Sequence, residues 1–283
     1  MNGESKKKIT ALSKTLLIIF LVIVILAILA FDVRLMTVYY MDSSPKINSS
    51  IRIALVTDLH SCYYGEKQSD LVDAINKEKP DIILLGGDIF DDDIPYKNAE
   101  IFMEEISKNY RCYYVTGNHE FWSDDCQNII SYLEKEGVTV LHGSYDTIKI
   151  NNDFINICGV DDPDIANYKE FDENIVNQLE ELERVSDNKY YTILLAHRPE
   201  YIDQYLQYGF DMVLCGHAHG GQWRLPGFIN GLYAPGQGFF PKYAGGEYEF
   251  KNGKLIVSRG LARESTRIPR IFNRPELVII NLK

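Results

Sequence analysis

The sequence predicts an α/β protein in which two mixed β-sheets pack together with helices outside, preceded by one membrane-spanning helix. Three observations predict this fold. Strand-like runs alternate with amphipathic segments from Ile51 to Lys135, which is typical of βαβ units on a largely parallel sheet. After Gly137, short strand-like runs follow one another with brief polar turns between them, which indicates antiparallel pairing. The third observation is an unbroken apolar run near the N-terminus.

The apolar run extends from Leu16 to Phe31 and, with Thr15, spans 17 residues. This is near the lower limit of about 17 to 25 residues for a helix that crosses a bilayer. Four lysines precede the run, whereas only Arg34 and Lys46 follow closely. Because cytoplasmic flanks carry the excess of Lys and Arg, the N-terminus is expected in the cytoplasm and the remaining domain on the extracytoplasmic side of the cell membrane.

Two other interpretations of this run are weaker. A cleaved signal peptide would fit the basic leader and the small residues Ala27 and Ala30, but the run exceeds the roughly 7 to 15 residues of a usual apolar signal region, and no clear cleavage motif follows. A buried core helix would show a polar face, which this run lacks. An uncleaved signal anchor is therefore favoured. The expected division is a basic leader (1–14), a transmembrane anchor (15–31), a juxtamembrane connector (32–50) and one catalytic domain (51–283).

The individual elements follow from the pattern of apolar residues. Residues 35–40 of the connector are expected as an edge strand. Further strands are expected at 51–56, 82–85, 112–115, 138–141, 145–150, 154–160, 191–196, 212–215, 247–250, 255–258 and 277–281. Helices are expected at 67–77, 98–107, 124–135, 173–184 and 200–208. The runs 138–141, 145–150 and 154–160 are separated by short turns and predict a hairpin or meander.

Composition excludes some functions. A net charge of −11 over 283 residues argues against broad nucleic-acid binding, which needs clustered Lys and Arg. It does not exclude a phosphorylated small molecule or lipid, because bound metal ions can supply local positive charge. The five cysteines are scattered and form no Cys-x-x-Cys pair, so they are expected as small buried hydrophobic residues and not as metal ligands.

Five of the strand-like runs end in side chains that coordinate metals. These are Asp58 and His60, Asp88, Asn118 and His119, His197, and His217 and His219. In open α/β sheets, ligands bind beyond the carboxyl ends of the strands, so residues far apart in the sequence converge there. Five of the six histidines belong to this set, and the sixth, His142, lies in a turn and is given no role.

The donor set consists of imidazole, carboxylate and amide groups without thiolate. Such a set suits manganese, iron or zinc, and donor type alone does not choose between them. The set is larger than one tetrahedral ion requires. Two divalent ions about 3.5 to 4 Å apart and bridged by one carboxylate would use it economically, and that arrangement activates a hydroxide for in-line attack at phosphorus.

The order of these motifs resembles a known family. Asp58-x-His60, Gly87-Asp88, Gly117-Asn-His-Glu, His197 and Gly216-His-x-His together look like the complete motif set of the calcineurin-like metallophosphoesterases. The stretches Ala196-His-Arg-Pro-Glu, Gly216-His-Ala-His-Gly-Gly-Gln and Leu232-Tyr-Ala-Pro-Gly-Gln-Gly resemble, more narrowly, its bacterial membrane-associated branch of YkuE-like and YaeI-like phosphoesterases. The resemblance covers about residues 51–283 and implies a four-layer α/β/β/α sandwich.

The resemblance also implies a role for each motif residue. One metal ion would be held by Asp58, His60 and His219, the other by Asn118, His197 and His217, and Asp88 would bridge the two ions. His119 would not bind metal but would face the scissile phosphate and protonate the leaving oxygen. The implied activity is hydrolysis of a phosphomonoester or phosphodiester bond by a metal-bound hydroxide. An anchor in the bilayer suggests an envelope or lipid-linked substrate.

Four further features are weighed against simpler interpretations. The acidic run 91–93 is expected as a solvated loop or helix cap and not as a metal site. Glu120 is expected to support His119 or the nearby backbone. Arg198, Arg259 and Arg263 would clamp phosphate or form structural ion pairs, and the sequence leaves both possibilities open.

The loop from Gly220 to Tyr243 directly follows the last histidine pair and is expected to wall the site. Its aromatic residues, Trp223, Phe239, Phe240 and Tyr243, would contact a lipid or a base, or else pack within the loop. A function of a different class is a metal-binding interaction module without turnover. The complete ligand set and His119 argue against that module.

Overall fold

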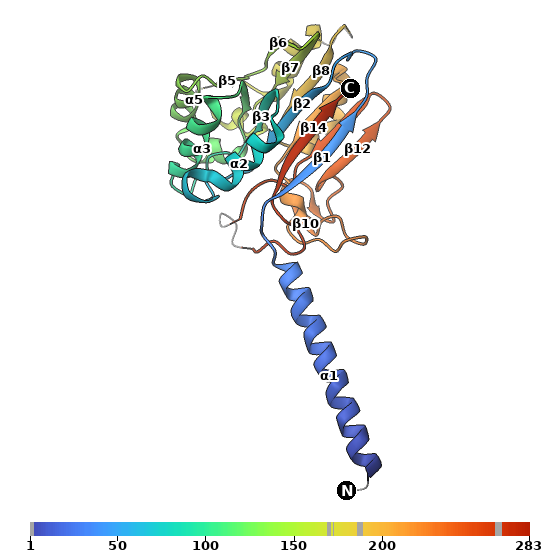
Figure 1. Ribbon diagram of the computed structural model, residues 1–283. Helices are drawn as coiled ribbons and strands as arrows, with labels where there is room; N and C mark the ends of the chain where they lie inside the picture. The colour runs from blue at the N-terminus through green and yellow to red at the C-terminus, as the bar shows by residue number, and fades with distance from the viewer. Residues whose placement is uncertain (1–2, 169–170, 172, 186–188, 264–267) are drawn as a thin grey trace.

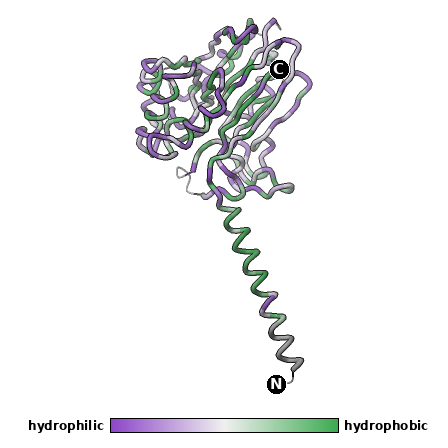
Figure 2. Tube along the Cα trace, viewed as in Figure 1, coloured by the Kyte–Doolittle hydropathy of each residue, from purple (hydrophilic) through white to green (hydrophobic). Residues whose placement is uncertain are grey.

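The computed structural model describes the whole chain except residues 1–2, 169–170, 172, 186–188 and 264–267. Met1 and Asn2 of the expected basic leader therefore lie outside the described residues. Helix α1 (Gly3–Ala30) projects away from a layered domain that holds the rest of the chain (Figure 1). Its segment Ala11–Ala30 is 20 residues long, apolar and exposed, and has the length and composition to cross a membrane (Figure 2).

The first sheet has six strands in the order β1-β14-β2-β3-β4-β5. All its neighbours are parallel except β14 and β2, which are antiparallel. The strands are β1 (Met36–Asp42), β2 (Ile51–Val56), β3 (Ile82–Gly86), β4 (Cys112–Val115), β5 (Thr139–Val140) and β14 (Glu276–Leu282). The edge strand expected at 35–40 is confirmed as β1.

The second sheet has six strands in the order β12-β13-β9-β8-β7-β6. The two outer pairs, β12–β13 and β6–β7, are antiparallel, and the central neighbours are parallel. The strands are β6 (Ser144–Ile150), β7 (Asp153–Gly159), β8 (Tyr191–Leu195), β9 (Met212–Cys215), β12 (Gly246–Phe250) and β13 (Gly253–Val257). A small hairpin of β10 (Tyr233–Ala234) and β11 (Gly238–Phe239) lies at the end of the domain near α1 (Figure 1).

Helices cover the outer faces of both sheets. The first sheet is covered by α2 (Ser69–Glu78), α3 (Lys97–Ser107) and α5 (Cys126–Lys135), and the second by α6 (Ile175–Leu182) and α7 (Ile202–Tyr205). Helix α4 (Asn118–Trp122) is a single short turn after β4. Short 3₁₀ turns lie at Glu66–Gln68, Pro163–Asn167, Glu183–Val185, Pro199–Tyr201, Leu206–Tyr208 and His219–Gly221.

Alternating side chains on β2 show how the layers are held together. Ile53 and Leu55 pack in the apolar core between the two sheets. Ala54 and Val56 point to the opposite face and pack beneath the helices. Because both faces of the sheet are covered, the central strands are apolar almost throughout, as is usual for parallel sheets. The predicted four-layer α/β/β/α fold is confirmed.

One predicted strand pairing is wrong. The run at 138–141 was expected to join the meander formed by the two following strands, but its centre forms β5, which pairs in parallel with β4 in the other sheet. Val138 packs beneath the helices of the first sheet, and the Leu141 amide donates to the carbonyl of Tyr114. These contacts bind the segment to β4. The hairpin of β6 and β7 is as predicted.

The prediction that the cysteines are buried is confirmed. Their positions are Cys62, Cys112, Cys126, Cys158 and Cys215, and all five are buried.

Candidate metal centre

The predicted ligands lie at one edge of the domain because the strands that precede them run in the same direction. Parallel pairing aligns the carboxyl ends of β2, β3 and β4 in the first sheet and those of β8 and β9 in the second. The two edges meet at Gly86, whose carbonyl accepts a hydrogen bond of 2.8 Å from His197 Nδ1. The sandwich thereby brings together side chains from five separate motifs.

The first cluster contains Asp58, His60, Asp88 and His219, whose ligand atoms all lie within 4.8 Å of one another. His60 Nε2 is 3.2 Å from His219 Nε2 and 3.6 Å from an Asp88 oxygen. His219 Nε2 is also 3.5 Å from an Asp58 oxygen. Three of these four side chains were predicted to hold one ion, with Asp88 as the bridge.

The second cluster contains Asp88, His197 and His217. His197 Nε2 lies 3.0 Å from the Asp88 carboxylate and 3.2 Å from His217 Nδ1. Asn118 begins α4 and is buried, with its side-chain oxygen unpaired among the described residues. The backbone N–H of the next residue, His119, donates a hydrogen bond of 2.9 Å to Asp88 Oδ1. Asp88 therefore belongs to both clusters, which is the arrangement that a bridging carboxylate requires.

The donor atoms fit divalent ions. Asp58 Oδ2 and Asn118 Oδ1 are buried and have no hydrogen-bond partner in the part of the chain that the structure describes, which is costly unless a cation satisfies them. His60 and His197 engage acceptors through Nδ1, so their Nε2 lone pairs face inward. Nitrogens bound about 2.0–2.1 Å from a shared ion stand about 3 to 3.4 Å apart, and both facing imidazole pairs are at 3.2 Å.

Burial and mutual charge set the protonation states of these groups. Burial lowers the pKa of His217 and of His219 well below the usual value, which keeps both rings neutral. Burial also raises the pKa of Asp58. For His197, burial favours the neutral ring, but the Asp88 carboxylate outweighs it and raises the pKa to about 10. With a metal ion bound, the His197 ring would be neutral, since imidazole ligands bind metal in the neutral form.

The backbone is strained at the same residues. Non-glycine residues seldom adopt positive φ, because the Cβ approaches the following carbonyl at a cost of about 1–2 kcal/mol each. Such strain often marks functional sites, where surrounding structure enforces it. Five of the eight predicted site residues have positive φ: Asp58 (51°), His60 (48°), Asp88 (52°), His217 (63°) and His219 (46°).

Two glycines leave space for the carboxylates. A Cβ on Gly117 would overlap an oxygen of Asp88, and one on Gly216 would lie 2.5 Å from an oxygen of Asp58. Turn geometry requires glycine at Gly87, where φ is 85°. The motif glycines therefore act in two ways, since the first two permit close approach and the third permits the turn.

His119 lies outside the two clusters that contain Asp88, but one of its ring nitrogens, one of His60 and an Asp91 oxygen lie within 4.8 Å of one another. Its side chain is 25% exposed, and its Nδ1 lies 2.5 Å from a carboxylate oxygen of Asp92. The ring also contacts His60 edge-on, at 4.4 Å between centroids, and lies 4.8 Å from the indole of Trp122. With Nδ1 engaged by Asp92, the other ring nitrogen is the one available for chemistry toward solvent or substrate.

The acidic run 91–93 is a loop in which Asp92 and Asp93 are exposed, as predicted, but Asp91 is buried. Asp91 is only 3% exposed and accepts a hydrogen bond of 2.8 Å from His60 Nδ1, while Asp92 engages His119. Carboxylates that orient the far nitrogen of a ligand histidine fix its tautomer and strengthen it as a ligand. The signal was a pair of aspartates three and four residues after a ligand, although such runs are usually solvated.

Glu120 supports the backbone, as expected. Its carboxylate accepts hydrogen bonds from the backbone N–H groups of Gly117, Asp88, Ile89 and Phe90 at 2.7 to 3.0 Å. Of the two possibilities for the arginines, ion pairing is observed at two. The pairs are Arg198–Asp162 at 2.7 Å and Arg259–Glu276 at 2.5 Å. The Arg263 guanidinium lies 4.1 Å from the ring centre of Tyr64.

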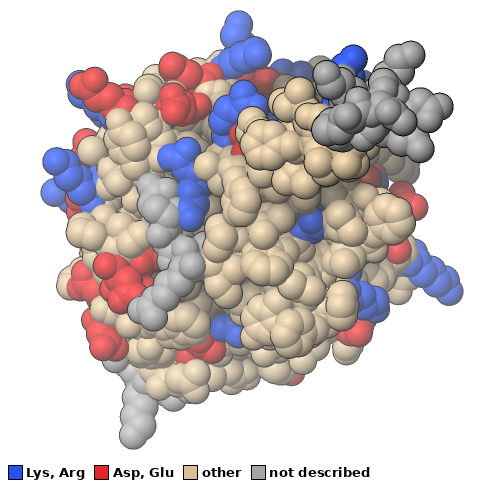
Figure 3. All heavy atoms as spheres, turned by 90° about the horizontal axis from the view of Figure 1, so that it is seen from below, with Lys and Arg blue, Asp and Glu red and all other residues tan. Residues whose placement is uncertain are grey.

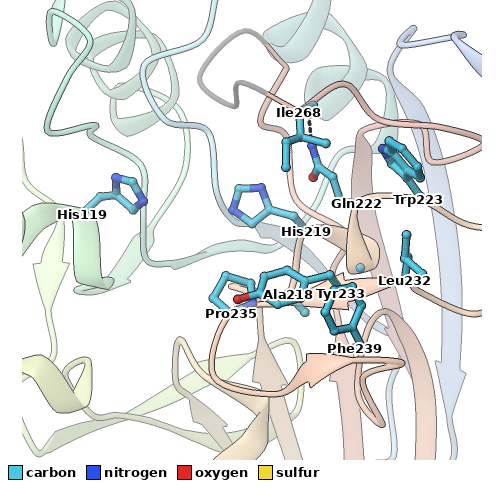
Figure 4. A pocket seen from close by; sticks show the side chains of 11 residues that line it. His119, Ala218, His219, Gln222, Trp223, Leu232, Tyr233, Pro235, Phe239 and Ile268 are labelled. Carbon is cyan, nitrogen blue, oxygen red and sulfur yellow. Dashed lines mark hydrogen bonds between the residues drawn. The ribbon is translucent and has the colours of Figure 1, made fainter.

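A pocket of about 600 Å³ adjoins the metal centre. His119 and Trp223 lie at opposite sides of it, His219 lies between them, and Tyr233 and Phe239 lie below His219 in the view of Figure 4. The loop 220–243 therefore walls the site, as predicted. Of its aromatic residues, Tyr243 is buried and packs against Tyr248 and Phe250 of β12, whereas Phe239 and Phe240 are 71% and 67% exposed.

Comparisons with known proteins agree with this geometry. The family model described as "Calcineurin-like phosphoesterase" matches residues 51–221. An uncharacterized metallophosphoesterase of Aquifex aeolicus is 31% identical over 251 residues, covering 86% of this chain and 88% of that protein. The uncharacterized metallophosphoesterase YkuE of Bacillus subtilis is 28% identical, covering 82% and 79%. A bovine "Transmembrane protein with metallophosphoesterase domain" is 30% identical, covering 67% and 46%.

Among solved structures, the NAD nucleotidase NadN of Haemophilus influenzae superposes with a TM-score of 0.52 at 15% identity. The superposition covers 76% of this chain and 46% of NadN. At this identity the likeness concerns the fold alone. This chain also spans less than half the length of NadN and of the bovine relative, so their additional regions have no counterpart in the match.

Proposed function

The chain belongs to the calcineurin-like phosphoesterase family, as its motifs predict, and on this premise we propose that it is a binuclear metal-dependent phosphoesterase. The reaction would be hydrolysis of a phosphomonoester or phosphodiester bond. One observation supports this proposal most strongly. Two clusters of buried metal-ligating side chains share the Asp88 carboxylate, at 3.6 Å from His60 and 3.0 Å from His197.

In this proposal seven residues hold two divalent ions of manganese, iron or zinc. Asp58, His60 and His219 hold one, Asn118, His197 and His217 hold the other, and Asp88 bridges them. When bound, two such ions provide an activated water and neutralise the charge that develops on the phosphoryl oxygens. The protein contributes the orientation of each ligand, notably through Asp91 at His60.

His119 serves as the proton donor to the leaving oxygen. Asp92 fixes the ring by its contact with Nδ1, which leaves Nε2 to carry the transferred proton. The ring lines the pocket that a substrate would enter, and its partial exposure permits proton exchange with solvent. The role of His119 is thus separable from metal binding.

The chain is proposed to sit in the cell membrane with a single span and an extracytoplasmic domain. The apolar helix α1 and its lysine-rich N-terminal flank support this topology, as does the transmembrane relative. The proposed division remains a leader at 1–14, an anchor at 15–31, a connector at 32–50 and the catalytic domain at 51–283.

The proposal is tested with the purified full-length chain and a panel of aryl phosphomonoesters and phosphodiesters, assayed with added manganese and after removal of metal by a chelator. We expect manganese-dependent turnover of at least one class. The alternative function is a metal-binding interaction module on the same fold. Two bound ions per chain without turnover of either class would favour that module and reject the enzyme.

A further inference from the structure

Strand directions place α1 and the metal centre at the same end of the sandwich. β14 is antiparallel to β2, with Val278 opposite Leu55. β1 is parallel to β14, with Met36 opposite Glu276. β1 therefore starts at the end where β2 finishes and delivers Asp58. Only residues 31–35 separate α1 from β1, so the helix leaves the domain beside the site (Figure 1).

The junction between α1 and the domain is tied at several points. The backbone N–H of Phe272 donates a hydrogen bond of 2.7 Å to the carbonyl of Ala30, the last residue of α1. Arg274 donates to the carbonyls of Arg34 and Leu35 at 2.9 and 3.0 Å. Because residues 31–35 are few and the junction is well bonded, the site end of the domain lies close to any membrane that α1 enters.

Exposed apolar side chains gather at this end. They belong to one loop and are called the apolar rim: Trp223 (40% exposed), Leu225 (46%), Phe228 (86%), Tyr233 (49%), Phe239 (71%) and Phe240 (67%). The rim is continuous with the junction, because Trp223 pairs with Ile271 and the neighbouring Phe272 bonds to α1. Figure 3, seen from below, shows mainly side chains other than Lys, Arg, Asp and Glu in the middle of the view, where α1 also projects toward the viewer.

One residue of the apolar rim has an unfavourable backbone conformation. Phe240 has φ of 56°, a conformation that residues with a Cβ seldom adopt. Its amide donates a hydrogen bond of 2.8 Å to the carbonyl of Leu232, which fixes the turn. The loop thus holds a large aromatic ring in solvent at a conformational cost, which water alone does not explain.

The apolar rim also reaches into the pocket of the metal centre. Trp223, Tyr233 and Phe239 line that pocket together with His119 and His219, and His119 lies at the side away from Trp223 (Figure 4). A molecule bound there would meet imidazole groups at one end and apolar walls at the other. This division matches an amphiphile whose polar group is a phosphate ester.

We propose that the apolar rim inserts into the interfacial layer of the membrane that α1 spans, and that the pocket takes a lipid phosphate ester from the same leaflet. Trp and Tyr side chains favour this layer because each combines an apolar ring with a polar group that can contact water. The lipid phosphate would lie at the metal centre and its chain against Trp223, Tyr233 and Phe239. The inference rests on the proposed phosphoesterase function and on α1 as a membrane span.

Membrane contact is measured by fluorescence quenching in proteoliposomes of phosphatidylcholine brominated near the head-group end of its acyl chains. The chain has two tryptophans, so Trp122→Phe leaves Trp223 as the single reporter. The matched control carries Trp122→Phe, Trp223→Phe and Phe154→Trp, because Phe154 is 41% exposed beside the start of β8, at the opposite end of the strands. We expect strong quenching of Trp223 and none of the control.

Equal quenching of the two reporters, or none of either, would overturn membrane insertion. If Trp223 is unquenched and the chain in detergent is a dimer that Phe228→Ser/Phe240→Ser dissociates, the rim belongs to a second copy of the chain instead. This measurement does not depend on activity and therefore stands apart from the proposed function.

Substrate class is measured with the same Phe228→Ser/Phe240→Ser chain, since neither side chain lines the pocket. Turnover is compared on a water-soluble aryl phosphate ester and on phosphatidate or phosphatidylglycerol in vesicles. We expect the variant to lose about tenfold or more of its turnover on vesicle lipid, because membrane affinity depends on inserted apolar surface, and to retain its turnover of the soluble ester.

The outcomes separate the two proposals. If the parent chain with manganese hydrolyses neither kind of substrate, the proposed phosphoesterase function fails. If it hydrolyses the soluble ester but no vesicle lipid, or if the variant matches the parent on vesicle lipid, the function stands and the lipid inference is overturned.

Discussion

The two ends of the sandwich each bury an aspartate, and they treat its charge differently. At the end opposite the site, Asp153 accepts hydrogen bonds from the backbone and side chains of Asn48 and Ser49, which lower its pKa to about 2. At the site end, Asp58 accepts one from the His217 amide, and its other oxygen has no partner among the described residues. Burial raises the pKa of Asp58.

The difference separates a structural carboxylate from a ligand. Where the fold supplies its own donors, the charge is stabilised internally and nothing further is required. Where the fold buries the group, gives its backbone a φ of 51° and leaves one oxygen without a hydrogen-bond partner among the described residues, we propose that a cation is the missing partner. Burial likewise keeps the imidazoles of His217 and His219 neutral, and His217 Nε2 and His219 Nδ1 have no hydrogen-bond partner among the described residues.

The largest effect is expected for Asp88→Ala, which removes the carboxylate shared by both clusters. We expect loss of both ions and a fall in turnover of at least about 10³-fold, which exceeds the 10- to 100-fold typical of supporting residues. Metal per chain is measured by elemental analysis of the purified variant, alongside turnover of an aryl ester with manganese. Full metal occupancy in this variant would remove Asp88 as the bridge.

The next effect is expected for His119→Ala, which separates turnover from metal binding at the site end. Both ions should remain, because His119 lies outside the two clusters that share Asp88. Turnover should fall by about 10²- to 10⁴-fold, the usual contribution of a positioned proton donor. Turnover of an ester with a more acidic leaving group should fall less, since the leaving oxygen of that ester needs less protonation. Loss of metal in His119→Ala would make it a ligand and contradict this assignment.

Sequence patterns predicted which side chains converge at one edge better than they predicted the carboxylates that contact them. The ligand motifs are short and follow apolar strands, so strand direction alone brings Asp58, Asp88 and His217 to one edge. The same rule correctly gives two packed sheets with helices outside. What the pattern lacks is side-chain direction in irregular segments: Asp91 and Asp92 lie in a turn, where no periodicity indicates which residue points inward.

The sequence pattern also did not predict which of the two sheets the run at 138–141 joins. The segment around β5 is short, and its local pattern suits either sheet; only packing of Val138 and Leu141 on separate layers decides for β4. The apolar rim was anticipated as aromatic residues in a loop, but its position beside α1 depends on β1 running parallel to β14. That register is a long-range choice that neither strand encodes alone.

A smaller effect is expected for Asp91→Asn, which keeps the shape of the side chain but removes its charge beside His60. We expect about 10- to 100-fold weaker metal binding, as for other carboxylates that orient a histidine ligand. Asp92→Asn is the matched control, because it contacts His119 and should lower turnover while leaving metal affinity unchanged. Titration of metal-free protein with manganese measures both. Equal metal affinity in Asp91→Asn and the parent would show that Asp91 does not support metal binding through His60.

The smallest effect on activity is expected for Asp153→Ala, at the other end of the sandwich. Metal content and turnover per folded chain should stay unchanged, while the melting temperature at neutral pH falls because Asn48 and Ser49 lose their acceptor. Since folding lowers the pKa from 3.8 to about 2, the stabilisation is complete above pH 3.8 and disappears as the pH falls through about 2. Denaturant unfolding should therefore show parent and variant converging in acid. If the difference in free energy of unfolding between parent and variant stayed constant over that pH range, or if Asp153→Ala lost metal, the contrast between the two ends would be wrong.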